Sequence, residues 1–250
     1  MKKFFSKQFW TDGAGSFALA ILIALTIRWG FMEPFVIPSP SMLPALLIHD
    51  HIFVNKFIYG LRVPFTDHYF IHFEKPKRGQ VIVFRYPDNP SIFYIKRIIG
   101  VPGDKIYYEK DNLYVNDKLV KNEVPEGERV SDFNWLTNSD FPGEGPNALA
   151  GYNEYEERLG HYKFGILLKK NKIDSTFGPI TVPPDSYFVM GDNRDNSNDS
   201  RFWRHMFVPR DYLIGRAMFV WLSCKKDFST VPICDPATIR WSRFFHEVIE

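Results

Sequence analysis

The sequence lacks most of the features that would assign it to a class at once. Its 250 residues hold only two cysteines, Cys224 and Cys234, and no Cys/His spacing typical of a metal site includes them. Basic and acidic residues are interspersed and leave a net charge of +2, without the basic stripe of a nucleic-acid binder. Only one long apolar run occurs, which excludes a polytopic membrane protein. Nucleic acid is therefore not an expected partner.

What the sequence does contain favours strands and turns. The 24 Phe, 12 Tyr and 18 Pro residues, with many Val and Ile, are typical of strands and turns rather than long helices. An apolar content of 45% is enough for a real core, in one domain of complex outline or two small ones. We therefore predict a mainly β body.

The single apolar run predicts a membrane anchor near the N-terminus. Lysines among the first seven residues precede the run Phe17–Ile27, and residues 15–32 would span about 27 Å as a helix, nearly the bilayer core. Arg28 is close enough to the far end to snorkel outward. We predict an uncleaved anchor over 15–33, with residues 1–14 in the cytoplasm and the rest outside. A cleaved secretory signal is the alternative, but no small-x-small cleavage site follows the run.

Short strands separated by turns follow the anchor. Seven segments have strand character and are bounded by Gly, Pro, Asp or Asn clusters: Ile52–Lys56, Gln80–Arg85, Ser91–Ile99, Lys105–Tyr108, Leu113–Val115, Ser186–Met190 and Leu213–Leu222. Between residues 121 and 179 the composition becomes polar and acidic, which predicts an inserted subdomain with long loops. The core is therefore expected to consist of two separated pieces.

The C-terminal region carries two further features. Asp235-Pro236 offers a cap with proline at the first helical position, and apolar residues then recur at helical spacing, at Trp241, Phe244, Phe245 and Val248. We predict a short amphipathic helix that packs on the body, with the bilayer as its alternative position. Cys224 and Cys234 either close a short disulfide loop in an oxidising compartment or remain free thiols.

The segment Pro38-Ser39-Pro40-Ser41-Met42-Leu43-Pro44 carries two hydroxyls that can act together. Ser39 precedes a proline and is held extended, so the side chains of Ser39 and Ser41 share one face. Ser41 keeps its own N–H, so this amide and the Ser39 hydroxyl can bind a developing oxyanion while Ser41 attacks. The alternative is an ordinary Pro/Ser turn that leaves the membrane.

A lysine base is available on the strand Ile92–Ile99. This strand is apolar on both faces, and by alternation Lys96 shares a face with Tyr94 and Ile98. Burial would lower the pKa of Lys96 from about 10.4 and leave an amine that accepts a proton near neutral pH. Arg97 stays protonated at any working pH, so we assign the base to Lys96. A snorkelling lysine is the alternative.

A polar loop from Met190 to Arg201 follows an apolar strand. Its density of Asx and Ser residues suggests a calcium loop, but neither possible starting aspartate puts the required ligands and glycine in place. We therefore set metal binding aside. We interpret the segment as a loop that folds over a site, with Ser197 the candidate to orient an amine.

The chain resembles the bacterial type I signal peptidases in three segments behind the anchor: Pro38–Pro44 with Leu46, Tyr94–Asp104 and Gly191–Arg201. They occur in the family's order. The resemblance implies a membrane-bound serine endopeptidase that removes signal peptides from exported preproteins after an Ala-x-Ala pattern, without metal or organic cofactor. It also implies a single-pass protein of the bacterial inner membrane, with its catalytic domain in the periplasm, near the secretion translocon.

The same resemblance implies roles for individual residues. Ser41 matches the nucleophile, Lys96 the general base, and Ser39 the hydroxyl that joins the Ser41 amide in the oxyanion hole. Ser197 matches the hydroxyl that hydrogen-bonds the lysine. Structural charge pairs correspond to Asp192, Asp199, Arg97 and Arg201. The apolar lining of pockets for small side chains corresponds to Phe35, Ile37, Met42, Leu46, Tyr94 and Ile95.

The implied fold is an antiparallel-sheet catalytic core with one N-terminal transmembrane helix. The first part of this core covers 34–104, an inserted β-rich subdomain 105–183, the second part of the core 184–224, and a C-terminal extension with the amphipathic helix 225–250. Three features depart from the family: Ala45 replaces the usual threonine, one anchor is visible where many Gram-negative relatives have two, and the cysteine pair lies near the C-terminus.

Three other interpretations are weaker. A Ser/Lys self-cleaving repressor would need a DNA-binding module where this chain has an apolar anchor. A membrane-tethered, non-catalytic binding module would use the polar loop only to present charge. A Ser-His-Asp triad would have to recruit His49 or His51, which follow Ser41 too closely for the usual arrangement, so we interpret them as surface or strand histidines.

Overall fold

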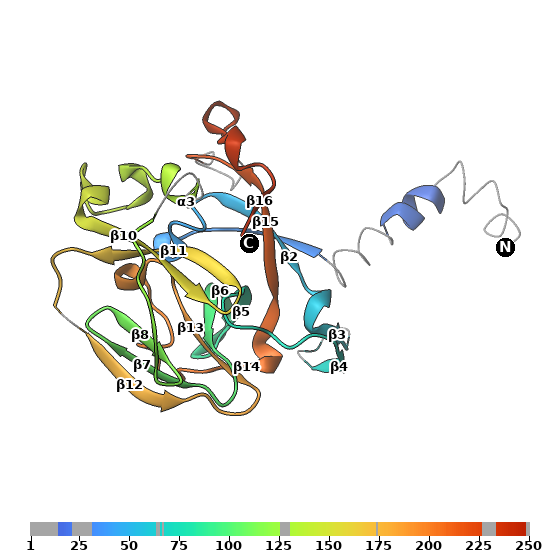
Figure 1. Cartoon of the computed structure of the whole chain (residues 1–250). Helices are drawn as coiled ribbons and strands as arrows, with labels where there is room; N and C mark the ends of the chain where they lie inside the picture. The colour runs from blue at the N-terminus through green and yellow to red at the C-terminus, as the bar shows by residue number, and fades with distance from the viewer. Residues whose placement is uncertain are drawn as a thin grey trace, which may run out of the picture.

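A computed structural model describes residues 15–21, 32–63, 66, 68–125, 131–173, 175–226 and 234–248. Almost all regular structure in these residues is antiparallel strand (Figure 1). The α-helical residues are 15–21 and the single turn α3 (Ser131–Asn134). The predicted mainly β body is therefore confirmed.

The largest sheet has eight strands and carries the core of the molecule. Its strand order is β1-β2-β15-β5-β6-β13-β14, with β16 added beside β15, so segments far apart in the sequence lie side by side (Figure 1). The strands are β1 (Met32–Val36), β2 (Asp50–Asn55), β5 (Val81–Tyr86), β6 (Asn89–Gly100), β13 (Ser186–Met190), β14 (Val208–Pro209), β15 (Leu213–Ser223) and β16 (His246–Glu247).

Three smaller sheets surround this core. A four-stranded sheet has the order β12-β7-β8-β9, and two hairpins pair β10 with β11 and β3 with β4. Their strands are β3 (Gly60–Arg62), β4 (Tyr69–His72), β7 (Lys105–Glu109), β8 (Asn112–Val115), β9 (Lys118–Val120), β10 (Tyr152–Leu159), β11 (Tyr162–Lys169) and β12 (Thr176–Thr181).

The main sheet is buried on both faces at its centre. Side chains alternate along a strand, and β5 accordingly sends Val81 and Val83 into one core cluster and Ile82 and Phe84 into another. All four are at most 2% exposed. A continuous apolar run is what a strand covered on both faces requires, and this explains why the segment has no polar alternation.

All seven predicted strands are present, and their ends differ from the prediction by at most two residues. The paired strands β10 and β11, eight residues each, lie in the insertion predicted to be β-rich with long loops, where no individual strand was assigned from the sequence. Glu156 and Glu157 on β10 are buried and hide its apolar pattern in the sequence.

The predicted anchor lies mostly outside the described residues. Residues 15–21 are helical, whereas Met32 and Glu33 lie in β1 and pair with Asn55 and Val54 of β2. Within the described ranges, no helix is long and apolar enough to cross a membrane.

The predicted C-terminal helix is wrong for the described residues 234–248. Asp235 does accept a hydrogen bond from the Ala237 amide, with proline at the first position, but only the short 3-10 turn η8 (Pro236–Thr238) follows. A second turn, η9 (Trp241–Arg243), leads to the strand β16. Phe245 has φ +58° and its amide bonds the Val220 carbonyl, so the backbone turns away from a helix to pair with β15.

Candidate active site

The turn that carries Ser41 follows directly from its prolines. Ser39 is extended, with φ −139° and ψ 155°, as a residue before proline should be, and Pro40 opens the 3-10 turn η2 (Pro40–Met42). Ser41 is the second residue of this turn and is only 6% exposed. The Ser39 and Ser41 hydroxyl oxygens lie 3.2 Å apart, so the two side chains share a face as predicted.

Lys96 reaches this turn from the buried half of β6. Residues 89–93 of the strand are exposed, whereas residues 95–100 are buried, and Lys96 itself is 4% exposed. Its Nζ donates a hydrogen bond to Ser41 Oγ at 2.5 Å. Two side chains 55 positions apart in the sequence are thus in direct contact.

The surroundings of Lys96 favour its neutral form. Burial lowers the pKa of Lys96 to about 8, because a charged ammonium loses its hydration there. Asp199 and Asp192 oppose this shift, and Arg201 reinforces it. The amine is therefore poised to gain or lose a proton close to neutral pH.

Two buried ion pairs lie beside the lysine. Arg97 donates to both carboxylate oxygens of Asp192, at 2.8 and 2.7 Å, and Arg201 donates to both of Asp199, at 2.9 and 2.8 Å. Burial would raise the pKa of Asp199, but Arg201 outweighs it and holds that pKa below its usual value. The predicted charge pairs are thus brought together, and bidentate geometry fixes their partners.

Ser197 lies in the same cluster but is not hydrogen-bonded to the lysine. It is buried beside Asp199, whose pKa it helps to lower, and no hydrogen bond in the described chain joins it to Lys96. Its neighbour in space is Gly191, where a Cβ would lie 2.3 Å from Ser197 Oγ and 2.4 Å from the Ser41 carbonyl oxygen. Only glycine allows this close approach.

Two contributors were missed in the sequence. Asn193 donates from its amide to the Ser41 carbonyl and from its side chain to the Pro40 carbonyl, both at 3.2 Å, and so fastens the turn to the polar loop. Arg194 forms a fully buried pair with Glu157 of β10, at 2.5 and 2.7 Å. The density of Asx residues was the only signal for Asn193, and nothing local marks the Glu157 partner.

A groove of about 370 Å³ opens beside the two hydroxyls. Its lining comes from Pro38–Ser41, Ile92–Lys96 and two asparagines, Asn196 and Asn198. Of the six residues predicted to line pockets, Tyr94 and Ile95 do so. Phe35 packs edge-on against Phe93 at 5.9 Å, while the remaining three, Ile37, Met42 and Leu46, lie with Ile95 in one core cluster.

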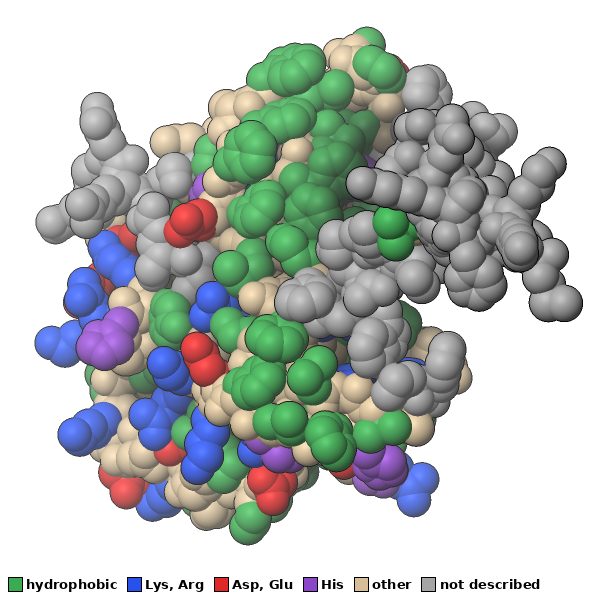
Figure 2. Space-filling model, turned by 90° about the vertical axis from the view of Figure 1, so that its right-hand side faces the viewer, with side chains coloured by type: hydrophobic (Ala, Val, Ile, Leu, Met, Phe, Trp, Pro, Cys, Tyr) green, Lys and Arg blue, Asp and Glu red, His purple; other side chains and the backbone are tan. Residues whose placement is uncertain are grey.

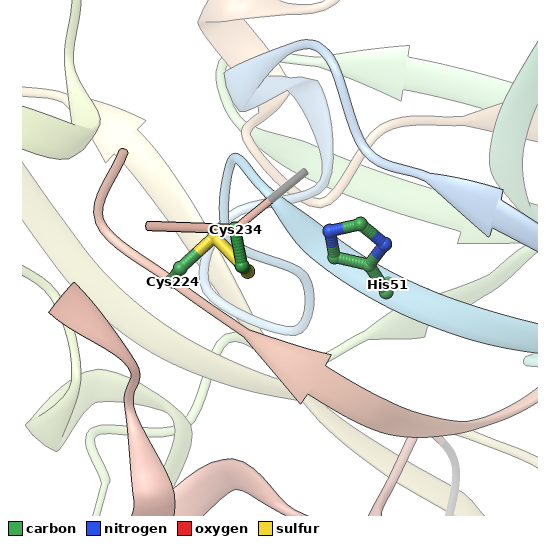
Figure 3. A group of neighbouring side chains, drawn as sticks. All are labelled: His51, Cys224 and Cys234. Atoms are coloured by element: carbon green, nitrogen blue, oxygen red, sulfur yellow. A yellow bond between two sulfur atoms is a disulfide. The ribbon is translucent and has the colours of Figure 1, made fainter. Parts of the chain in front are cut away.

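The histidines 49 and 51 lie elsewhere. His51 packs edge-on against Trp221 at 5.5 Å and, in the described chain, no hydrogen bond links a histidine to Ser41. Figure 3 shows His51 beside Cys224 and Cys234, all with potential ligand atoms within 4.8 Å of one another. The two cysteines form a disulfide, however, and a metal would require thiolates. Of the two alternatives for these cysteines, the structure has the disulfide and not the free thiols.

Comparisons with known proteins agree on one family. The family model described as "Signal peptidase, peptidase S26" matches residues 10–222. Signal peptidase I of Pseudomonas aeruginosa is 41% identical over 220 residues, which are 83% of this chain and 71% of that protein. Signal peptidase I of Rickettsia prowazekii is 40% identical over 222 residues, which are 84% and 80% of the two chains. A crystal structure of a signal peptidase I from Enterococcus faecalis, 26% identical, covers 57% of this chain and 97% of that one with a TM-score of 0.34.

Proposed function

Because this chain belongs to the signal peptidase family, peptidase S26, and is a serine peptidase that removes signal peptides, we propose that Ser41 is its nucleophile and Lys96 its general base. The observation that carries the proposal is the 2.5 Å hydrogen bond between Lys96 Nζ and Ser41 Oγ in a buried setting. A nucleophile and a base within hydrogen-bond reach are the minimal unit of this chemistry.

In the first half of the cycle, neutral Lys96 takes the Ser41 proton while Ser41 Oγ attacks the scissile carbonyl carbon. The amine thereby becomes an ammonium, and it then gives its proton to the leaving amine as the peptide bond breaks. In the second half, Lys96 activates a water that hydrolyses the acyl-enzyme ester. A pKa of about 8 suits both proton transfers, because either form of the amine is accessible near neutral pH.

The oxyanion that forms in each step needs donors. Ser41 lies in the first turn of η2, where amides have no acceptor within the turn, so its N–H is available to a ligand. The Ser39 hydroxyl, 3.2 Å from Ser41 Oγ, lies close enough to be the second donor. These two groups supply the oxyanion hole in our proposal.

The preprotein binds in the groove as an extended strand. Within the described sheet, β6 pairs with β5 along one edge and with β13 only from Arg97 onward, so the other edge of residues 92–95 is open. An extended peptide can add its backbone to such an edge, with alternate side chains in pockets. Tyr94 and Ile95 line this groove and correspond to the family's pockets for small side chains, which supports cleavage after Ala-x-Ala.

The charged residues keep this geometry rather than react. We assign Arg97 with Asp192, and Arg201 with Asp199, to structural pairs that hold the polar loop against Ser41. In our proposal, Ser197 orients the lysine when substrate is bound. Ser197 already lies close to Gly191, and Gly191 lies beside the Ser41 carbonyl.

The enzyme works at a lipid surface in our proposal, held by the N-terminal anchor with its catalytic body on the periplasmic side near the translocon. Figure 2 shows hydrophobic side chains gathered in a band on the side that carries β2, β3 and β4 in Figure 1. Successive aromatic rings on β2, β15 and the C-terminal segment are 5.4–6.4 Å apart, in the order Trp221, Phe53, Phe219, Phe245, Phe244 and Trp241. We call these six residues the aromatic row. Trp241 and Phe245 are exposed and the other four are partly buried. Exposed aromatic rings are typical of contact with the bilayer interface.

The test is labelling by a serine-directed acylating probe in the presence and absence of a signal-peptide mimic. We expect one label, on Ser41, that the mimic prevents, and none in Ser41→Ala. The matched control Ser91→Ala removes an exposed serine from β6 and should label and cleave like the parent chain. Preprotein cleavage by folded Ser41→Ala would refute the nucleophile.

A further inference from the structure

The C-terminal segment, residues 234–248, contacts the loop that carries Ser41. This loop runs from η2 to the start of β2 at Asp50, and the Leu47 amide bonds the Asp50 carboxylate at 2.8 Å. Arg243 of η9 is fully buried beneath it. Its guanidinium bonds both Asp50 oxygens, at 3.3 and 2.6 Å, and the Ala45 carbonyl at 3.1 Å. One side chain therefore ties the middle of the loop to its end.

A second arginine extends the same contact. Arg240 donates to the Ile48 carbonyl at 3.1 Å, to the Cys224 carbonyl at 2.7 Å, and to the Asp140 carboxylate at 2.9 Å. The nucleophile loop, the end of β15 and the turn η4 (Asn138–Asp140) are thus joined through one guanidinium. Arg240 and Arg243 leave the loop little freedom to shift.

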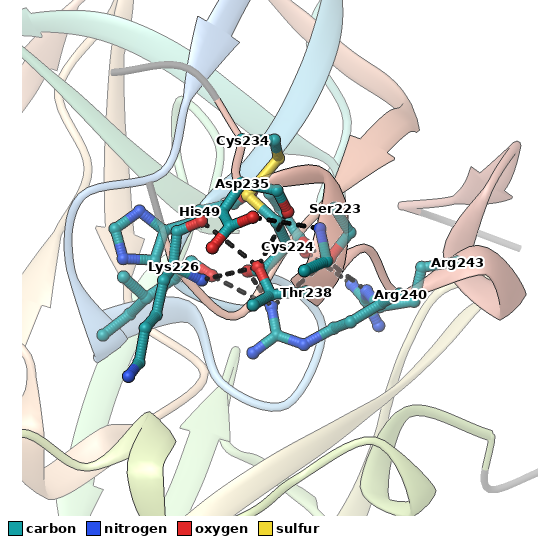
Figure 4. The surroundings of a disulfide bond; sticks show 12 residues. His49, Ser223, Cys224, Lys226, Cys234, Asp235, Thr238, Arg240 and Arg243 are labelled. Atoms are coloured by element: carbon teal, nitrogen blue, oxygen red, sulfur yellow. Dashed lines mark hydrogen bonds and ion pairs between the residues drawn. A yellow bond between two sulfur atoms is a disulfide. The ribbon is translucent and has the colours of Figure 1, made fainter. Parts of the chain in front are cut away.

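The disulfide attaches the segment that presents these arginines. Figure 4 shows Cys234, Asp235, Thr238 and Arg240 beside the bond to Cys224. Backbone hydrogen bonds reinforce it, from Lys225 to Thr238, from Asp235 to Lys226 and from Arg240 to Ser223. The covalent bond lies at the start of the segment, and Arg243 lies nine positions further along.

We infer that Arg243 is a positioning residue for Ser41, and that the Cys224–Cys234 disulfide acts as a latch that holds the segment carrying Arg243 against the nucleophile loop. Peptidase activity therefore depends on the thiol–disulfide state of the enzyme. The inference rests on the proposed role of Ser41. A nucleophile loop that shifts by a fraction of an ångström loses its alignment with Lys96 Nζ, and misplacement of about 1 Å costs about 10²-fold in rate.

Opening the latch is a two-electron reduction. Dithiothreitol supplies two electrons and two protons, the S–S bond breaks, each cysteine sulfur becomes a thiol, and the reagent closes to its cyclic disulfide. Because the backbone hydrogen bonds to β15 remain, the segment loosens rather than leaves. The activity loss on reduction should therefore be smaller than that of removing the guanidinium.

The test uses full-length enzyme in detergent micelles, a preprotein substrate, and the acylating probe to titrate active sites. We expect Arg243→Gln to lower kcat per titrated site about 10²-fold with KM changed less than about twofold. Arg243→Lys should recover part of the loss, since an ammonium keeps the charge but cannot span three acceptors. The matched control Arg158→Gln alters an exposed arginine of β10 and should keep the parent kcat. Misfolding would lower the titre and not kcat per site, so an unchanged kcat per site in Arg243→Gln overturns the positioning role.

Reduction gives a second, independent arm. Dithiothreitol should lower kcat of the parent enzyme, whereas Cys224→Ser/Cys234→Ser should start at the lowered value and not respond. Full activity after complete reduction, or a response of the double variant, overturns the latch. If the parent chain neither labels at Ser41 nor cleaves, the proposed function fails instead.

Discussion

In the proposed mechanism, the chemistry depends on an amine and a hydroxyl that meet in a buried place. Lys96 is 4% exposed and bonds Ser41 Oγ at 2.5 Å, and its neighbour Arg97 is turned to Asp192 on the other side of the strand. Alternation along β6 separates the two cations: one is neutralised by a carboxylate, and the other is left to lose its proton. A lysine can serve here because its pKa shifts readily on burial, whereas an arginine would remain charged.

Ser39→Ala tests the oxyanion hole at the residue scale. The substitution removes the hydroxyl 3.2 Å from Ser41 Oγ, and we expect kcat to fall about 10²–10³-fold with little change in KM. Ser39→Thr keeps a hydroxyl and should retain most activity. Steady-state cleavage of a preprotein measures both. An alanine variant as fast as the parent enzyme would show that a group other than the Ser39 hydroxyl is the second oxyanion donor.

At the scale of elements, the site is formed where the turn η2, the strand β6 and the polar loop come together. Asn193 bonds the carbonyls of Pro40 and Ser41, and Gly191 lets the loop approach the Ser41 carbonyl without a side chain between them. Arg194 then ties the loop to Glu157 of β10. The orientation of the nucleophile is therefore set by contacts far from the nucleophile in sequence.

Gly191→Ala should disturb this contact specifically. Its Cβ would lie 2.4 Å from the Ser41 carbonyl oxygen, so the turn or the loop must move. We expect a destabilisation of about 1–3 kcal/mol and a loss of activity of about 10²-fold. Gly151→Ala is the control, because a Cβ there meets nothing within 4 Å. Chemical denaturation and preprotein cleavage measure the two effects, and equal behaviour of the two variants would contradict the account.

The strands were predictable from the sequence for physical reasons, whereas the pairing of Ser41 with Lys96 was expected mainly from the resemblance to the family, and the structure places the two side chains in contact. The apolar second half of β6 favours a buried Lys96, and the proline after Ser39 favours an extended Ser39. The pairing of Glu157 with Arg194, and that of Arg243 with Asp50, could not be predicted, because 37 and 193 positions separate the partners and neither acid has a local signal. The C-terminal helix failed because helical spacing of Trp241, Phe244 and Phe245 also suits two 3-10 turns pinned to β15 by backbone bonds.

At the scale of the molecule, one eight-stranded sheet carries half of the aromatic row and one wall of the groove. β2 and β15 present Phe53, Phe219 and Trp221, and β6 of the same sheet carries Lys96. The sheet therefore fixes where the active site lies relative to the aromatic surface. An enzyme bound to the bilayer through this surface would hold its active site at a fixed distance from the membrane.

Replacing Trp241 and Phe245 by serine tests the role of that surface. Both side chains are more than 70% exposed, so the fold should tolerate the change. We expect slower cleavage of a preprotein embedded in vesicles and unchanged cleavage of a soluble peptide that carries the same site. Equal slowing of both substrates would show that the row supports the fold and not the contact with lipid.

The most direct measurement for the central claim is the titration of the Lys96 amine, followed by isotope-edited NMR together with the rate of Ser41 acylation across pH. Burial lowers the pKa of Lys96, so the neutral form grows as pH rises, and acylation should increase through a midpoint of about 8 and then level off. Lys96→Arg, which keeps its charge, should show no acylation at any pH. An amine that titrates near 10.5 while the enzyme is already fully active at pH 7 would contradict the account.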